Sequence, residues 1–262
     1  MSEEKLMRID DLKTKIAQGK LVKGVFITMA DSVSSEMAGY CGYDYVWIDA
    51  EHGALDRQEI LAHIRAAQGT GCCAFVRVRV VDPSLMKAIL DMGPDGVIFP
   101  FCDNAEIARL AIASCAYPDS ALHGIRGQGP VRAIRYGLDD EGTYLEHAYE
   151  KVLKILQIET IEGYENLKQI IEVPGIDSLF IGAADLSRSI AGSEKHYDLS
   201  TVYDEICHQV RQAGLLLGAA IGPTLSDARK VMSKGVQWVV FGQDSRILAE
   251  GLNANLKALE GV

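Results

Sequence analysis

The 262-residue sequence lacks the patterns that mark disulfide-rich, zinc-binding or nucleic-acid-binding proteins. Its six cysteines form no Cys-x-x-Cys pair and lie mostly in apolar runs, which argues against a zinc ribbon or a disulfide framework. We therefore expect reduced thiols in a cytoplasmic protein. Basic residues are outnumbered, with 26 Lys and Arg against 36 Asp and Glu, so the formal charge is −10. This charge speaks against nucleic acid or an anionic membrane surface as the main partner.

Long apolar segments are also missing. The N-terminus has no apolar signal-peptide stretch. The longest apolar run, Leu215–Leu225, is shorter than the roughly 20 residues that a membrane span needs. No linker, low-complexity stretch or short repeat divides the chain, so we expect a single soluble domain over residues 1–262.

Short apolar, β-branched runs alternate with amphipathic segments along the whole chain. The first 20 residues predict a helix with Leu6, Ile9, Leu12 and Ile16 on one stripe. The expected strands are Gly24–Thr28, Tyr45–Ile48, Ala74–Val78, Gly96–Pro100, Val152–Glu159, Ser178–Gly182, Leu215–Ile221 and Trp238–Gly242. Further helices are expected at Arg57–Gln68, from Pro83 onward, and at Ala105–Ala113, Gly163–Glu172, Tyr203–Ala213, Ser226–Lys234 and Ile247–Leu259.

This alternation predicts an α/β fold with right-handed crossovers and a parallel sheet. Eight strand–helix units in about 250 residues are typical of a (β/α)₈ TIM barrel, here with an extra N-terminal helix. The alternative, an open doubly wound sheet, normally has a glycine fingerprint after its first strand, and no G-x-G-x-x-G stands there. The long irregular segment Tyr117–Gly142 suggests a lid or a subunit contact.

Polar residues gather at the predicted carboxyl ends of the strands, where TIM barrels place their chemistry. Strand parity puts both Gln157 and Glu159 inside the barrel, where a buried amide and carboxylate need partners. Glu159 and Asp185 follow neighbouring strands and could give two oxygens to one divalent cation, Mg²⁺ or Mn²⁺. These carboxylates could instead pair with Arg77 or Arg79, or cap helices.

One histidine stands in the same context. His52 follows the second predicted strand beside Asp49 and Glu51. A histidine next to carboxylates can act as a general base near neutral pH, whereas a lone loop histidine is usually only a polar surface residue. Both interpretations stay open from the residues alone.

Several short runs, in this order along the chain, resemble one enzyme family. They are Asp49–His52, Arg77 followed by Asp82-Pro83, Leu90–Gly93, Gly124–Gly127, Gln157–Thr160 and Phe180–Ser187. Together they are similar to the metal-dependent (class II) pyruvate aldolases, the family of 4-hydroxy-2-oxo-heptanedioate aldolase and the 2-keto-3-deoxy sugar-acid aldolases. The resemblance covers nearly the whole chain.

The resemblance implies a (β/α)₈ barrel that reversibly cleaves a 4-hydroxy-2-keto acid to pyruvate and an aldehyde. It implies a divalent cation, Mg²⁺ or Mn²⁺ with Co²⁺ or Zn²⁺ as alternatives, held by Glu159 and Asp185. Gln157, Gly182, Ala184 and Asp185 would bind the keto acid.

For the chemical step, the resemblance implies that Arg77 stabilises the enolate oxygen. His52, paired with Asp91, would act through a bound water as the acid and base. The family often forms homo-oligomers, here expected as a hexamer or a trimer, in which a C-terminal helix is exchanged between subunits. Ile247–Leu259 is the candidate for that helix.

Two departures from the family pattern bear on specificity. Ala183 stands where the family usually has proline, and the segment 119–123 is longer than usual. They leave open a related metal-dependent reaction on pyruvate or oxaloacetate, either decarboxylation or carbon–carbon bond formation. A separate alternative is a non-catalytic barrel that binds a keto acid, and the intact set of Arg77, His52, Asp91, Glu159 and Asp185 argues against it. A Schiff-base aldolase would need an inward-facing lysine. The parity of Lys154 points it outward.

Overall fold

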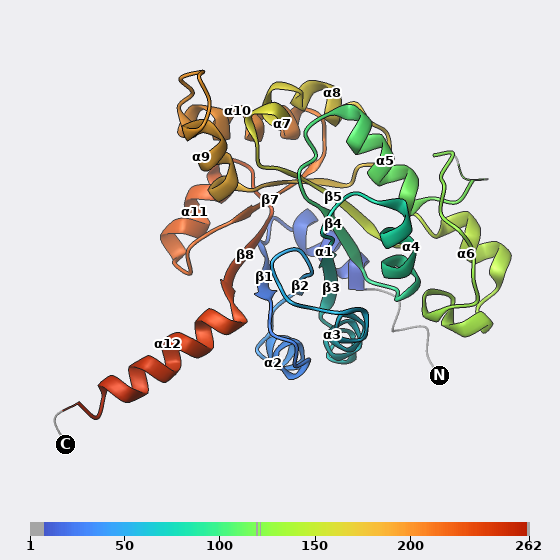
Figure 1. Ribbon diagram of the computed structural model, residues 1–262, viewed down its shortest axis with the longest axis horizontal. Coiled ribbons are helices and arrows are strands. Elements are labelled where there is room, and N and C mark those ends of the chain that lie inside the picture. The colour runs from blue at the N-terminus through green and yellow to red at the C-terminus, as the bar shows by residue number, and fades with distance from the viewer. Residues whose placement is uncertain (1–7, 119, 121, 261–262) are drawn as a thin grey trace.

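The computed structural model describes residues 8–118, 120 and 122–260 (Figure 1). Within these residues, eight parallel strands close into a barrel in sequence order, as the alternating pattern predicts. The strands are β1 (Val22–Ile27), β2 (Tyr45–Asp49), β3 (Cys73–Arg77), β4 (Gly96–Phe99), β5 (Leu153–Ile158), β6 (Ser178–Ile181), β7 (Leu216–Ala220) and β8 (Trp238–Gln243). The fold is the expected (β/α)₈ barrel.

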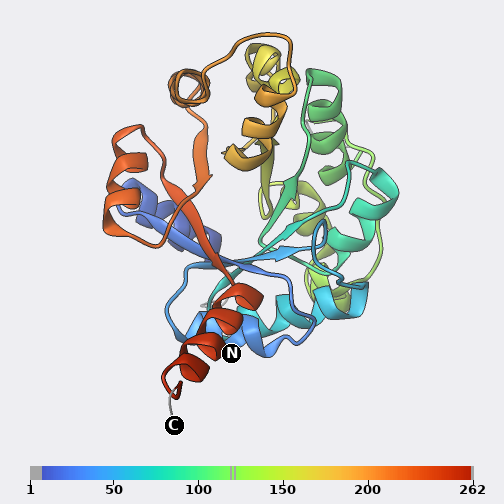
Figure 2. The same cartoon turned by 60° about the vertical axis from the view of Figure 1, so that its left-hand side comes forward.

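Helices surround the barrel, and one extends away from it (Figures 1 and 2). They are α1 (Arg8–Ala17), α2 (Val33–Tyr40), α3 (Arg57–Gly69), α4 (Pro83–Asp91), α5 (Ala105–Cys115), η2 (Arg132–Gly137), α6 (Glu141–His147), α7 (Ile161–Glu165), α8 (Leu167–Ile171), α9 (Ala183–Ala191), α10 (Leu199–Gln212), α11 (Leu225–Ser233) and α12 (Asp244–Lys257). In the described part of the chain, no helix combines the length and the hydropathy that a membrane span requires.

Local sequence signals set several helix starts. Asp56 caps α3 by accepting hydrogen bonds from the backbone N–H groups of Gln58 and Glu59, while Glu59 accepts one from the N–H of Asp56. Helix α1 begins at Arg8, so Leu6 of its predicted apolar stripe lies outside the described residues. Leu12 of α1 is buried against the barrel and helps to close its amino-terminal end.

Aromatic rings fill the barrel interior. The indole of Trp47 meets the ring of Phe180 edge-on, with centroids 4.7 Å apart, and Tyr45 stacks on Phe75 at the same distance. Gly218 leaves room for Trp238, because a Cβ at this glycine would lie 2.2 Å from an indole atom. The inner cluster consists of Leu12, Val22, Tyr45, Trp47, Cys73, Phe75, Ile98, Leu153, Ile155, Phe180, Trp238 and Val240.

A larger outer cluster of mainly aliphatic side chains lies between the strands and the helices, and it includes Val46, Val76 and Leu156. Lys154 points to this side, as its parity predicts. Its Nζ lies 2.6 Å from the carboxylate of Asp177. Because side chains fill the barrel interior, we expect ligands to bind at the carboxyl ends of the strands and not inside the barrel.

The structure differs from the sequence prediction in two segments, the one that follows β6 and the one that follows α5. Strand β6 ends at Ile181 and α9 starts at Ala183, so Asp185 lies in the first turn of a helix and not on a strand extension. Leu186 is the one buried residue of α9, and a single buried apolar residue is too weak a pattern to predict a helix from the sequence. The segment after Tyr117 is not wholly irregular, since it contains η2 and the start of α6.

Candidate active site

A cavity of about 570 Å³ opens at the carboxyl ends of the strands. It brings together the predicted site residues His52, Arg77, Gln157, Glu159, Gly182, Ala184 and Asp185. Asp91 is the exception, because it does not line this cavity. The other lining residues are Phe26, Thr28, Trp47, Asp49, Gly53, Ala54, Phe180, Ala183, Ala220 and Gln243.

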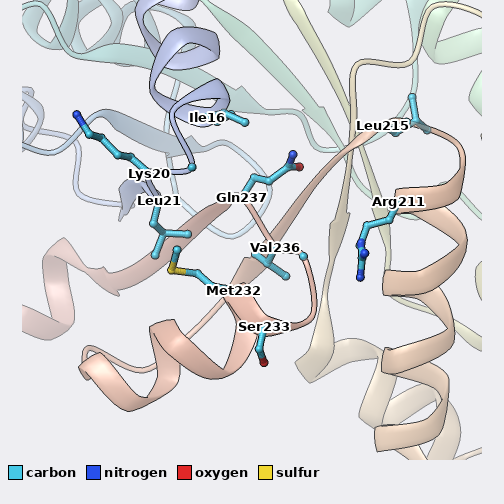
Figure 3. A pocket seen from close by; sticks show the side chains of 12 residues that line it. Ile16, Lys20, Leu21, Arg211, Leu215, Met232, Ser233, Val236 and Gln237 are labelled. Atoms are coloured by element: carbon cyan, nitrogen blue, oxygen red, sulfur yellow. The ribbon is translucent and has the colours of Figure 1, made fainter.

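A second cavity of similar size, about 540 Å³, lies at the opposite end of the barrel (Figure 3). Its side chains come from α1, α10 and α11 and from the residues that precede β1, β7 and β8. Lys20 and Arg211 at its edge are both exposed. It contains none of the predicted site residues, and TIM-barrel chemistry belongs to the other face. We therefore take the first cavity as the candidate active site.

Arg77, at the end of β3, is buried and held on two sides. Its Nε and Nη2 donate to the two carboxylate oxygens of Asp49, at 3.0 and 2.5 Å. Its Nη1 lies 2.8 Å from Oε2 of Glu51, and the guanidinium lies over the ring of Trp47. Nε and Nη2 thus donate hydrogen bonds to Asp49, Nη1 forms an ion pair with Glu51, and Arg77 lines the cavity.

Asp49 also shapes the loop after β2. Its Oδ1 accepts hydrogen bonds from the backbone N–H groups of Glu51 and His52, at 3.1 and 3.2 Å. Arg79 supports the same loop by donating to the carbonyl oxygens of Ala50 and Leu55. Arg79 therefore positions the loop and does not line the cavity, whereas Arg77 does.

Glu159 follows β5, and its carboxylate is almost fully buried at 2% exposure. Its Oε1 accepts a hydrogen bond from the backbone N–H of Phe101 at 2.8 Å, and its Oε2 accepts one from Nε2 of Gln157 at 3.0 Å. The pKa of Glu159 is raised to about 7, mainly by burial and also by the charges of Glu51 and Asp185, while the Phe101 N–H and Arg77 oppose this rise.

The residues around Glu159 fit a hard divalent cation. Gly182 forms a cradle for the carboxylate, because a Cβ there would lie 2.7 Å from Oε2 of Glu159. Oε1 of Gln157 is buried without a hydrogen-bond partner. Mg²⁺ and Mn²⁺ prefer such oxygen donors and take waters or substrate for the remaining positions. Among the described residues, no group of three or more His, Cys, Asp and Glu side chains is placed to hold a metal ion.

His52 lies at the rim of the cavity with 66% of its side chain exposed, and its Nε2 is 4.0 Å from Oε2 of Glu51. Asp91, at the end of α4, is instead paired with Arg126 at 3.6 Å. No hydrogen bond or ion pair between these two described residues joins His52 to Asp91 within one chain. Arg126 itself lies over the ring of Tyr117 and donates to the hydroxyl of Tyr144. Burial raises the pKa of Asp91 above its usual value.

Comparison with known proteins identifies the family of this chain. The family model for HpcH/HpaI aldolase/citrate lyase matches residues 23–250. The chain belongs to this family. It is therefore an aldolase, and aldolases are lyases. This is the enzyme class that the resemblance of its motifs predicts.

Relatives of this HpcH/HpaI family member align along nearly all of its length. It is 33% identical to a 4-hydroxy-2-oxovalerate aldolase of Rhodococcus jostii over 94% of each chain. It is also 33% identical to a 2-dehydro-3,6-dideoxy-6-sulfogluconate aldolase of Pseudomonas putida, over 91% of this chain and 92% of the other. A solved HpcH/HpaI aldolase/citrate lyase family protein from Burkholderia cenocepacia superposes with a TM-score of 0.86 at 27% identity, covering 96% and 99%.

Sequence reasoning missed three residues at the cavity of this HpcH/HpaI aldolase: Asp49 and Gln243, which line it, and Glu51, which forms an ion pair with Arg77. The sequence indicates Asp49 and Glu51 only as neighbours of His52, since the alternative of pairing with Arg77 or Arg79 concerned Glu159 and Asp185. Burial raises the pKa of Glu51, and Arg77 opposes that effect. Gln243 stood in the sequence as a polar residue at the end of β8, but strand parity alone gave no reason to place it in the cavity.

Proposed function

We propose that this HpcH/HpaI aldolase reversibly cleaves a 4-hydroxy-2-keto acid to pyruvate and an aldehyde with the help of a divalent cation. The observation that carries the proposal is the buried group at the carboxyl ends of β3, β5 and β6. Arg77, Gln157 and Glu159 line one cavity with Asp185, and all but Asp185 are almost fully buried. Burying charged and polar side chains lowers the stability of the folded protein, and such buried groups are typical of catalytic sites.

Glu159 and Asp185 would hold the cation, with Mg²⁺ or Mn²⁺ favoured by the carboxylate donors and Co²⁺ or Zn²⁺ as alternatives. When bound, the cation supplies a Lewis acid for the negative charge that develops on the 2-keto oxygen during cleavage. Gln157, Gly182 and the backbone of Ala184 bind the keto acid beside it.

Arg77 stabilises the same developing charge with the positive charge of its guanidinium group. Because Asp49 and Glu51 already fix the guanidinium, it needs no rearrangement during the reaction. A lysine could not reproduce this planar group, which donates to both carboxylate oxygens of Asp49 and lies beside Glu51.

His52 acts through a bound water on the proton of the 4-hydroxyl, for which its place at the cavity rim is suitable. Asp91 lies outside the cavity of its own chain. Its part in this proton transfer therefore requires an assembly in which Asp91 faces the cavity of a neighbouring copy.

The C-terminal helix supports a homo-oligomer, expected as a hexamer or a trimer. Helix α12 extends away from the barrel and has no buried residue (Figures 1 and 2). Five large apolar side chains on or just after it are exposed, namely Ile247, Leu248, Leu252, Leu256 and Leu259. An apolar face of this kind on an extended helix fits a second copy of the chain. Sedimentation velocity of the chain truncated after Gln243 should show a smaller species than the full chain.

Two further features agree with a cytoplasmic enzyme that acts on small molecules. All six cysteines are free, and five of them are buried. The net charge of −10 gives no basis for nucleic-acid binding.

The test is pyruvate release from a panel of 4-hydroxy-2-keto acids, followed with lactate dehydrogenase. We expect excess chelator to abolish release and Mg²⁺ or Mn²⁺ to restore it. Glu159→Gln should lose metal binding in calorimetry while it stays folded, and Glu162→Gln, an exposed change on α7, should keep both properties. Full activity in excess chelator, or borohydride trapping of a covalent pyruvate adduct, would refute the metal-dependent mechanism.

A further inference from the structure

A bulge in β8 turns Gln243 into the cavity. Trp238 and Val240 point inward with the inner cluster, and Phe241 packs on the outer cluster. In an unbroken strand Gln243 would therefore point outward. The pairing with β1 shifts instead by one residue, so that Gly24 faces Val240 but Phe26 faces Gln243.

Glycine makes this shift possible. Gly242 adopts a φ of 73°, a left-handed conformation that side chains other than glycine's rarely tolerate. Bulges are uncommon between parallel strands, and beside active sites they serve to re-aim a side chain. The bulge in β8 therefore lies at the point where it directs the side chain of Gln243 into the active-site cavity.

A hydrogen-bond network fixes which end of the Gln243 amide faces the ligand. The carboxylate of Asp244 accepts hydrogen bonds from the hydroxyl of Thr28 and from the N–H groups of Thr28, Met29 and Ser245. Because the hydroxyl of Thr28 donates to Asp244, its oxygen is left to accept from Nε2 of Gln243, at 3.1 Å. The same Nε2 donates to Ser245 at 2.9 Å.

The amide nitrogen of Gln243 is therefore satisfied. Its carbonyl Oε1 has no hydrogen-bond partner in the described part of the chain. An amide oxygen only accepts hydrogen bonds, so the ligand group that it fits is a donor such as a hydroxyl.

Gln243 and Thr28 also mark a side of the cavity without a basic side chain. They belong to β8 and to the residue after β1, across the barrel from Glu159 after β5. The basic side chains that line the cavity, among described residues, are His52 at the rim and Arg77, which two carboxylates already engage. Asp244 adds a negative charge directly behind Thr28. A second anionic group on the substrate would lie near the negative charge of Asp244 and meet no basic side chain on this side.

We propose that Gln243 binds a hydroxyl group on the aldehyde half of the substrate, and that the enzyme prefers neutral, hydroxylated aldehydes to aldehydes with a second acidic group. This inference rests on the proposed function, since the keto acid would occupy the side of the cavity at Glu159 and Asp185. The aldehyde half then extends towards Gln243 and Thr28.

The test runs the reaction in the aldol direction with pyruvate and saturating Mn²⁺. Three aldehydes are compared, namely glyceraldehyde, propanal and succinic semialdehyde. The wild-type enzyme should have the highest kcat/KM with glyceraldehyde. Gln243→Leu should lower the glyceraldehyde-to-propanal ratio of kcat/KM about tenfold, the effect of one lost hydrogen bond in a buried site. Because both aldehydes are measured on the same preparation, the ratio does not depend on the folded fraction.

Gln169→Leu, an exposed change of the same kind on α8, is the matched control and should leave the ratio as it is. A wild-type preference for succinic semialdehyde, or an unchanged ratio in Gln243→Leu, would overturn the inference and leave the proposed function standing. If pyruvate condenses with none of the three aldehydes, the proposed function fails, and the inference fails with it.

Discussion

Glu159→Gln should make the metal-free protein more stable while it destroys the metal site. Glu159 carries a buried negative charge near Glu51 and Asp185, and this environment raises its pKa from 4.5 to about 7. Each pKa unit corresponds to about 1.36 kcal/mol, so the ionised side chain lowers the stability of the folded state by at most about 3 kcal/mol above pH 7. Gln keeps the acceptor for the Phe101 N–H, and Gln157 can turn its free Oε1 towards the new amide.

The sign of the pH dependence follows from the raised pKa. Below pH 4.5, Glu159 is protonated in both the folded and the unfolded chain, so the substitution changes little. As the pH rises towards 7, the unfolded chain releases its proton first, and the wild-type folded state loses stability that the glutamine variant keeps. The advantage of the variant should thus grow between these values and then level off.

Thermal unfolding in excess chelator, followed by circular dichroism at acidic and at alkaline pH, measures this effect. We expect a gain of about 1–3 kcal/mol at about pH 8, or roughly 3–8 °C in Tm for a chain of this length, and almost none near the acidic limit. Glu162→Gln serves as the exposed control and should show no gain at either pH. An equal gain in stability at both pH values, or a loss at alkaline pH, would refute the view that the buried negative charge of Glu159 destabilises the folded state.

Three other predictions follow from the same contacts. Arg77→Lys should lower kcat by about 10²–10³-fold, as for a lost oxyanion donor. Arg79→Lys should have a much smaller effect, because Arg79 donates only to carbonyl oxygens of the loop. Equal losses of kcat would mean that the wrong arginine is assigned to the chemistry. His52→Ala should slow carbon–carbon cleavage by about 10²–10⁴-fold and leave pyruvate affinity in calorimetry intact; unchanged cleavage would make His52 an ordinary loop residue. Burial lowers the pKa of His63 below its usual 6.5, so the wild type loses stability as the pH falls through that value. His63→Gln should flatten this decline of Tm, and an unaltered slope would show that His63 does not cause it.

The barrel could be predicted from sequence because each of its strands is a short apolar run between helical segments. The same periodicity correctly placed Gln157 and Glu159 on the inward face and Lys154 on the outward face. These are consequences of strand alternation, which depends only on local sequence. They needed no knowledge of what lies opposite each residue.

The rest depends on contacts between distant segments. The bulge at Gly242 reverses the parity of Gln243, and only the register against β1 reveals it. Asp49 and Glu51 became site residues because β3 brings Arg77 beside them, and several partners were possible from spacing alone. Asp91 was grouped with His52 by resemblance, but within one chain Arg126 is its partner.

The most direct test of the central claim, metal-dependent activation of pyruvate in this cavity, is proton exchange, since it requires no knowledge of the aldehyde. The enzyme is incubated with pyruvate in D₂O, and the methyl signal of pyruvate is followed by NMR with Mg²⁺, with Mn²⁺ (removed by chelator before recording) or with chelator throughout. We predict exchange of the methyl protons when the cation is present, and none with chelator or in Glu159→Gln. Exchange that continues undiminished in excess chelator, or its absence at saturating metal, would contradict the claim.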